Sequence, residues 1–342
     1  MTIVYGIIIL LILIFVHETG HLVSAKLTGV RVNEFALGMG PKLFGFTRGE
    51  TQYTFRAIPF GGFCSMEGED DDSEDPRAFN KKPARVRALI LFAGSIMNIL
   101  LAVVLLALII FYMGVPTTKI AEVEPGSNAY MDGLRPGDQL VYVNGTAIEE
   151  WNDISPVLEN AAANDPDQNP PLTLTVIRDG SETNISTHLY TDDTGRLRLG
   201  ITPEYGRSAG FFFKSFGYGA RATFLMGKMM YEVLGDLFSG QAGVDQLTGP
   251  VGIFVTVGDM AALGMIYLVQ LTALISLNLA IINLLPFPAL DGGRLLFLLI
   301  RKITGKKITD EIEGRVHLIG IIVLLAFMAL ITLQDINRFF IN

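Results

Sequence analysis

Two histidines and a glutamate stand close together near the start of the chain, in the order His17-Glu18-Thr19-Gly20-His21. This is the H-E-x-x-H pattern, in which two imidazoles four residues apart lie on one face of a helix and can bind the same zinc ion. The glutamate between them is then placed to act as the general base that activates water for hydrolysis. Because so short a pattern also arises by chance, the residues around it decide its weight.

The pattern lies within an apolar segment. The run Ile3 to Val16 precedes it and Leu22 to Ala25 follows it, so one continuous helix would carry it into a membrane. Ionisable side chains in a membrane span are costly and usually mark a function. One alternative is a polar helix end that water satisfies at the membrane surface. Another is a signal peptide, but the first five residues lack its basic segment and no small-residue cleavage site follows.

A catalytic zinc needs a third protein ligand and an open position for water. Cys64 is the only cysteine, so the chain offers neither a cysteine-based zinc site nor an intrachain disulfide. His188 belongs to a polar region, and His317 stands beside Arg315 at the start of an apolar run. Asp291 is the better candidate, because prolines and glycines break the backbone around it at membrane depth, which is tolerated only in protein or beside an aqueous cavity. The predicted ligands of one zinc ion per chain are His17, His21 and Asp291.

The elements that must position these residues are membrane helices. The chain of 342 residues is half hydrophobic, with a mean hydropathy of +0.43. At about 1.5 Å of rise per residue, most of its long apolar runs can cross a hydrocarbon core of roughly 30 Å as helices. The runs are Ile3 to Val16, Ala88 to Met113, Met265 to Leu285 and Leu318 to Leu333. We predict a polytopic α-helical membrane protein with about four transmembrane helices, whose catalytic core is divided between residues 1–113 and 241–342.

Basic residues indicate how the helices are oriented. They cluster beside the second apolar run, at residues 81–87, and in a predicted short loop before the fourth, at residues 301–315, where Lys306 and Lys307 contribute. Since such flanks face the cytoplasm, we expect the N-terminus, residues 114–263 and the C-terminus to be extracytoplasmic. The zinc site then lies toward the cytoplasmic side, about 24 Å along the first helix.

Three features lie between the runs. The alternating residues 52–58 predict a β-hairpin within residues 45–63, and the acidic residues 67–75 predict a solvated loop. Residues 207–240 are apolar but carry charges at seven-residue spacing, which places them on one helical face. We interpret this segment as an amphipathic helix in the membrane interface rather than a fifth span. The charges are Lys214, Arg221 and Lys228.

Residues 118–203 form a predicted extracytoplasmic domain. Residues 124–129 and 133–145 resemble a PDZ domain, an α+β fold that binds the C-termini of peptides by adding the peptide as a strand to a sheet edge. The resemblance implies a loop for the terminal carboxylate, the alternative being an ordinary strand end. That loop would consist of Leu199, Gly200 and Ile201.

As a whole, the chain resembles the site-2 protease family, and within it the bacterial RseP-type zinc metalloproteases of regulated intramembrane proteolysis. The segments that carry the resemblance are His17 to Lys26, Phe35 to Phe44, Ile58 to Phe63, Phe92 to Asn98, Leu247 to Pro250 and Asn283 to Gly293. The resemblance implies zinc binding by the two histidines and Asp291, with Glu18 activating water. Two departures are Ser95, where the family usually has proline at the start of the second helix, and a single PDZ domain where some relatives have two.

The resemblance also implies how a substrate is held. Two glycines and the β-hairpin that follows them would form a membrane-associated β element that offers an edge to an extended substrate. Two asparagines would hold the substrate near zinc. This is physically sensible, because a substrate helix must unwind before cleavage and its freed N–H and C=O groups need partners. Together with two helix-breaking prolines, the predicted substrate-binding set is Gly38, Gly40, Asn278, Asn283, Pro286 and Pro288.

We therefore expect an intramembrane zinc endopeptidase of the bacterial cytoplasmic membrane that cleaves the transmembrane segments of single-span proteins. Anti-sigma-factor-like proteins trimmed beforehand by another protease, and remnant signal peptides, are the expected substrates. The lipid bilayer and peptide C-termini are the other expected partners, and no nucleic acid is expected. An alternative is a catalytically silent PDZ scaffold for exported protein tails, against which the intact H-E-x-x-H pattern argues. A transporter would show inverted internal repeats, and the sequence shows none.

Overall fold

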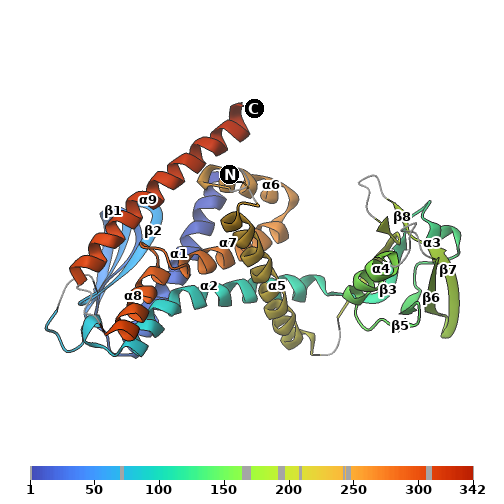
Figure 1. Cartoon of the computed structure of the whole chain (residues 1–342), viewed down its shortest axis with the longest axis horizontal. Coiled ribbons are helices and arrows are strands. Elements are labelled where there is room, and N and C mark those ends of the chain that lie inside the picture. Colours follow the sequence, from blue (N-terminus) through green and yellow to red (C-terminus); the bar gives the residue numbers. More distant parts are fainter. Residues whose placement is uncertain are drawn as a thin grey trace. The chain divides into compact units, whose positions relative to one another are not determined.

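The computed structural model describes residues 2–69, 73–163, 171–191, 197–207, 210–241, 243, 248–305 and 310–341. It forms two compact units, one of Met1–Ile109 with Phe213–Asn342 and one of Ile110–Phe212 (Figure 1). Parts of five predicted features lie outside the described residues. They are residues 70–72 of the acidic loop, residues 164–170 and 192–196 of the predicted domain, residues 208–209 of the amphipathic segment, Leu247, and the basic pair Lys306 and Lys307.

Four helices of the described part are long and apolar enough to cross a membrane. This confirms the predicted polytopic membrane protein. The first helix runs unbroken through His17 and His21, as the sequence predicts. The four are α1 (Thr2–Leu27), α2 (Ala84–Met113), α7 (Met265–Asn283) and the stretch Ile312–Phe340, which belongs to α9 (Asp310–Ile336) and the π-helical turn η4 (Asn337–Ile341).

A shorter apolar helix, α6 (Pro250–Leu263), precedes α7. The sequence patterns do not predict it, because its apolar run is shorter than a span and ends at Gly264, where the backbone turns with φ of 128°. It packs against the first half of α1, where Val257 shares a buried cluster with Ile9 and Leu13. The unit formed by Met1–Ile109 with Phe213–Asn342, called the membrane unit below, therefore contains a helix, α6, that a count of spans misses.

The amphipathic segment is a single helix, α5 (Phe211–Ser239). Its small and apolar residues pack on α2 and α7, in a cluster that includes Ala222, Met226, Met230, Leu234, Ala102, Leu106, Ala273 and Leu277. The three basic residues at seven-residue spacing are exposed. Thus one face of α5 covers other helices of the membrane unit and another face carries the charges.

Two long, bent strands follow α1: β1 (Val32–Arg48) and β2 (Thr51–Met66). Residues 34–37 of β1 pair with residues 62–65 and also with residues 52–55. This part of β1 therefore lies between two parts of β2, and the sheet is wider and longer than the hairpin predicted within residues 45–63. The end of β2 packs on α1, because Cys64 and Met66 share a buried cluster with Ala25.

After α7 the chain turns over residues 284–290, and α8 (Asp291–Thr304) begins at Asp291. The short loop predicted for the basic residues 301–315 is wrong at both ends, because Arg315 lies in α9 and Arg301 and Lys302 lie in α8. The leucines of α8 recur at helical spacing, and Leu295 and Leu298 pack into the same cluster as the end of β2. A 3₁₀ turn, η1 (Phe79–Lys81), precedes α2 in the same region.

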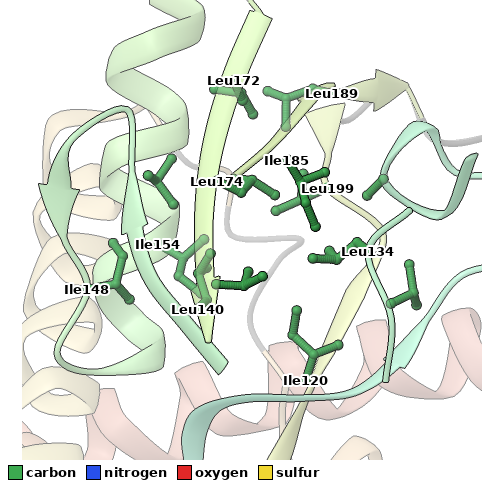
Figure 2. Close-up of a cluster of buried hydrophobic side chains, with 14 residues drawn as sticks. Ile120, Leu134, Leu140, Ile148, Ile154, Leu172, Leu174, Ile185, Leu189 and Leu199 are labelled. Carbon is green, nitrogen blue, oxygen red and sulfur yellow. The ribbon is translucent and has the colours of Figure 1, made fainter. Parts of the chain in front are cut away.

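The second unit contains a six-stranded sheet in the order β10-β3-β4-β6-β7, with β5 paired to β4. Its inward side chains, from strands, loops and α4, point toward one another and form the core (Figure 2). The strands are β3 (Val115–Val123), β4 (Gln139–Val143), β5 (Thr146–Ala147), β6 (Pro171–Arg178), β7 (Ser181–His188) and β10 (Ile201–Gly206), with a separate pair β8 (Tyr190–Thr191) and β9 (Leu197–Arg198). The helices are α3 (Asn128–Met131), η2 (Trp151–Asp153) and α4 (Ile154–Ala163).

Candidate metal centre

Three side chains from α1 and α8 meet inside the membrane unit. Asp291 Oδ2 lies 3.2 Å from His17 Nε2 and 3.4 Å from His21 Nε2, and the two imidazole nitrogens are 3.2 Å apart. The histidines are buried, and the aspartate is mostly so. The H-E-x-x-H helix and the broken segment before α8 thus supply one compact set of ligand atoms.

The distances within this set fit a tetrahedral zinc ion. Two ligands at about 2.0–2.1 Å from such an ion are roughly 3.3 Å apart, close to all three observed separations. His21 donates its Nδ1–H to the Ile90 carbonyl at 2.9 Å, which leaves the lone pair of a neutral imidazole on Nε2. That lone pair faces Asp291 Oδ2, an acceptor with no other hydrogen-bond partner among the described residues. Two acceptors that face each other indicate a site for a cation.

Helix α2 closes one side of the ligand set with a glycine. A Cβ at Gly94 would lie 2.4 Å from His21 Nε2 and 2.7 Å from His17 Cε1. Ser95, next to it, is buried in the interior of α2 rather than at its start. The departure from the family pattern at this position therefore has no bearing on where the helix begins, contrary to the sequence interpretation.

Glu18 lies beside β2. Its Cγ lies 3.3 Å from where a Cβ of Gly62 would be, and its carboxylate faces the backbone N–H of Cys64. The end of β2 is thus the strand segment next to Glu18. Gly38 and Gly40 lie instead at the bend of the sheet, where a Cβ on Gly38 would meet the Ile58 carbonyl at 2.8 Å.

The turn before Asp291 is held by His317, a residue that was considered only as a zinc ligand from the sequence. Ala289 adopts φ of 83°, which is unusual for a residue with a side chain. Its N–H donates to His317 Nδ1 of α9 at 3.0 Å. The signal in the sequence is a histidine at the start of an apolar helix, but nothing local shows that its partner is a backbone group 28 residues away.

Two glycines let α8 begin against this turn. A Cβ on Gly292 would lie 2.2 Å from the Leu285 carbonyl oxygen, and one on Gly293 would lie 2.3 Å from that of Phe287. Any side chain there would push α8 away and move Asp291 with it. The double glycine is therefore a packing requirement of the site.

The predicted substrate-binding residues from α7 to Pro288 differ in how close they lie to the ligand set. Asn283 lies at the site, with Nδ2 3.4 Å from His17 Nε2. Asn278 is exposed on α7, and five residues of helix turn it about 140° away from Asn283. Pro286 is also exposed, whereas Pro288 packs against Gly320 of α9. Of the six predicted substrate-binding residues, all of them described by the structure, only Asn283 makes a polar contact with the ligand set.

The residues predicted to bind a peptide carboxylate lie in the other unit. Leu199 is buried, Gly200 has φ of 74°, and Ile201 begins β10, the strand at one end of the sheet. The Gly200 carbonyl accepts from the Glu124 N–H at 2.8 Å, which ties the loop to the neighbouring turn.

Comparison with known proteins agrees with this chemistry. Residues 5–327 match the model of peptidase family M50. The chain is 37% identical to a provisionally named zinc metalloprotease of Clostridium acetobutylicum, with 95% of this chain and 94% of that protein covered. It is 32% identical to the regulator of sigma-W protease RasP of Bacillus subtilis, with 99% of each protein covered. It is also 30% identical to the zinc metalloprotease RasP of Geobacillus kaustophilus, with 96% of each covered. The chain therefore belongs to peptidase family M50, the site-2 protease family, and is a zinc metalloprotease.

Proposed function

We propose that this chain is an intramembrane endopeptidase whose catalytic zinc is held by His17, His21 and Asp291, with Glu18 as general base. The observation that carries the proposal is the convergence of these three ligand atoms, 3.2–3.4 Å apart, from a helix that can span a membrane and from the helix that follows the break after α7. A hydrolytic site among apolar helices acts on peptide bonds that are themselves in the membrane.

The residues divide the chemistry between them. When bound, zinc polarises the scissile carbonyl and makes water a nucleophile at neutral pH. Glu18 accepts the proton of the attacking water and returns it to the leaving amine. The Cys64 N–H faces the Glu18 carboxylate and holds it toward the space between α1 and β2. The Ile90 carbonyl fixes the orientation of the His21 ring.

The substrate must be extended where it meets this site. Each unpaired backbone group in hydrocarbon costs several kcal/mol, so the enzyme has to supply partners for the unwound segment. We place these at residues 62–64 of β2, next to Glu18, and at the Asn283 amide. The substrate edge is thus the end of β2, and Gly38 and Gly40 shape the bend that brings the two strands together.

The substrates we propose are single-span membrane proteins, including anti-sigma-factor-like proteins trimmed beforehand and remnant signal peptides. The support is the intramembrane position of the ligand set together with the relative named as a regulator of sigma-W protease. A bacterial cytoplasmic membrane follows from the same relative and from the four spans. We propose the orientation that the basic flanks favour, with the N-terminus and residues 118–203 outside.

We further propose that residues 118–203 are a PDZ domain that binds peptide C-termini. Supporting this, β10 lies at one end of the sheet, so a peptide can pair with its outer side. The glycine before β10 has a positive φ, which suits a tight loop whose N–H groups face a carboxylate. The domain would control which substrates reach the zinc site.

The test is a comparison of membrane proteomes from cells that carry wild-type enzyme or the Glu18→Gln variant. The proposal predicts that the variant accumulates single-span proteins whose outer parts have been removed. Unchanged membrane proteomes, with both proteins expressed equally, would favour the silent scaffold.

A further inference from the structure

A partly buried ion pair joins the segment after β2 to the helix that carries Asp291. Arg294 Nη1 donates to Glu69 Oε1 at 2.7 Å, and the side chains are only 23% and 15% exposed. Arg294 stands one turn after Asp291 in α8, and Glu69 stands three residues after the end of β2. The pair thus connects two elements that are far apart in the sequence.

Glu69 is itself tied to β2. Its second carboxylate oxygen, Oε2, accepts from the Met66 N–H at 3.2 Å, and the Glu69 N–H donates to the Met66 carbonyl at 3.3 Å. Met66 and Cys64 are buried in one cluster with residues of α1, α2 and α8. A shift of Glu69 would therefore be transmitted to the strand segment that faces the general base.

The contacts form a closed loop around the site. Glu18 faces Cys64, Cys64 and Met66 belong to one strand, Glu69 holds Met66, and Arg294 holds Glu69 on the helix of Asp291. The general base and the third ligand are thus linked through one ion pair as well as through apolar packing. Such a partly buried pair is costly to break, since the remaining charge keeps its desolvation penalty.

A second pair on the same helix offers a comparison. Arg301 Nη2 donates to Glu313 Oε2 at 2.6 Å, with exposures of 18% and 20%. It matches the first pair in chemistry and burial, and it lies seven residues further along α8. However, Glu313 belongs to α9, so this pair joins α8 to α9, whereas the first pair joins α8 to the segment that follows β2.

We propose that Glu69 and Arg294 are positioning residues: their ion pair sets the place of Asp291 relative to Glu18 and to the strand edge that receives the substrate. The inference rests on the proposed ligand set. It predicts that zinc retention and turnover depend on this pair more than on the equivalent pair to α9. A substrate strand that adds to the end of β2 would, through the same contacts, act on the aspartate.

The experiment measures zinc retention of the full-length purified protein against a competing chelator, together with kcat, KM and the thermal unfolding midpoint. The variants are Arg294→Gln, Glu69→Gln, the double variant and Arg294→Lys, with Arg301→Gln as the matched control and Asp291→Ala as the reference for a lost ligand. We expect each single change to weaken zinc retention by about 10- to 100-fold, the range for residues that orient metal ligands. The double variant should lose no more than either single one, because both remove the same interaction. Arg294→Lys, which keeps the charge, should lose less.

Three outcomes would overturn the inference. The first is wild-type zinc retention and kcat in Arg294→Gln while Asp291→Ala loses zinc, which rejects the pair alone. The second is an equal loss in Arg294→Gln and Arg301→Gln that follows the unfolding midpoint, which shows general stabilisation of α8. The third is additive losses in the double variant. If Asp291→Ala itself retains zinc, the proposed ligand set is wrong and the inference fails with it.

Discussion

Gly94 of α2 lies directly against the imidazole of His21, so closely that a methyl group at this position would be 2.4 Å from Nε2. The neighbouring histidine is equally near, with its Cε1 at 2.7 Å. The ligand face of α1 therefore requires a partner helix with no side chain at this point. Together with the hydrogen bond from His21 to the Ile90 carbonyl, this close approach limits where the two rings can lie.

We predict that Gly94→Ala lowers zinc retention roughly tenfold or more, because overpacking of this kind costs about 1–3 kcal/mol. The helix propensity of alanine would by itself favour α2, so a loss cannot come from the helix. Gly227→Ala in α5 is the control, since among the described residues no atom beyond the neighbouring backbone of α5 lies within 4 Å of a Cβ there. Equal zinc retention in Gly94→Ala and wild type would show that the ligand rings lie elsewhere.

His317 provides a second prediction. Changing it to Leu removes the acceptor for the Ala289 N–H, and an unpaired N–H costs about 1–3 kcal/mol. The turn before Asp291 should loosen, which lowers both zinc retention and the thermal midpoint. His188→Leu, at an exposed position on β7, should change neither. If His317→Leu retains zinc like wild type, the turn holds its shape without this bond.

The ligands of the site can be predicted from the sequence better than the residues that pack around them. His17, His21 and Asp291 could be predicted as partners because helical spacing and a broken span are local patterns in the sequence. The contact of Gly94 with His21 joins two helices, and helix pairing leaves no local pattern. The bond from Ala289 to His317 is hidden for the same reason.

The fold shows the same division. Four spans follow from the lengths of apolar runs, whereas α6 falls below the length that marks a span. The two-sided pairing of residues 34–37 was missed because alternation predicts a strand but not the number of its partners. In α8, the charged residues suggested a loop, although Leu295 and Leu298 are placed by the helix into an apolar cluster that also holds residues of α1, α2 and β2.

A third prediction concerns the pH dependence of the second unit. Burial raises the pKa of Asp138, but hydrogen bonds from the Arg178 side chain and the Arg135 N–H outweigh it and hold that pKa below its ordinary value. A carboxylate with a lowered folded pKa stabilises the fold above the unfolded pKa of about 3.9. That stability is lost as the pH falls from there through the folded pKa.

Asp138→Asn should therefore destabilise the unit by about 1.5–3 kcal/mol near pH 7, and the difference from wild type should shrink below pH 4. Trp151 is the only tryptophan and packs against the core of this unit. Its fluorescence therefore reports unfolding of this unit within the intact protein. A difference that stays constant from pH 7 to pH 2 would mean that the charge of Asp138 has no part in it.

The fourth prediction separates substrate holding from chemistry. Asn283→Leu should impair cleavage of a stable, leucine-rich substrate helix much more than cleavage of one already unwound by glycine or proline, because the first needs partners for its freed backbone. Asn278→Leu, on a different face of α7, is the comparison and should have a smaller effect. Equal losses on both substrates, with zinc retained, would place Asn283 in the chemical step.

The most direct test of the central claim is the zinc content and peptidase activity of purified protein in lipid vesicles that contain a single-span substrate. Wild type should hold about one zinc per chain and cleave within the span. Asp291→Ala should lose both zinc and cleavage, while Glu18→Gln should keep the zinc and lose cleavage, since an amide cannot accept the proton of the attacking water. Zinc bound as tightly by Asp291→Ala as by wild type, or cleavage by Glu18→Gln at the wild-type rate, would contradict the account.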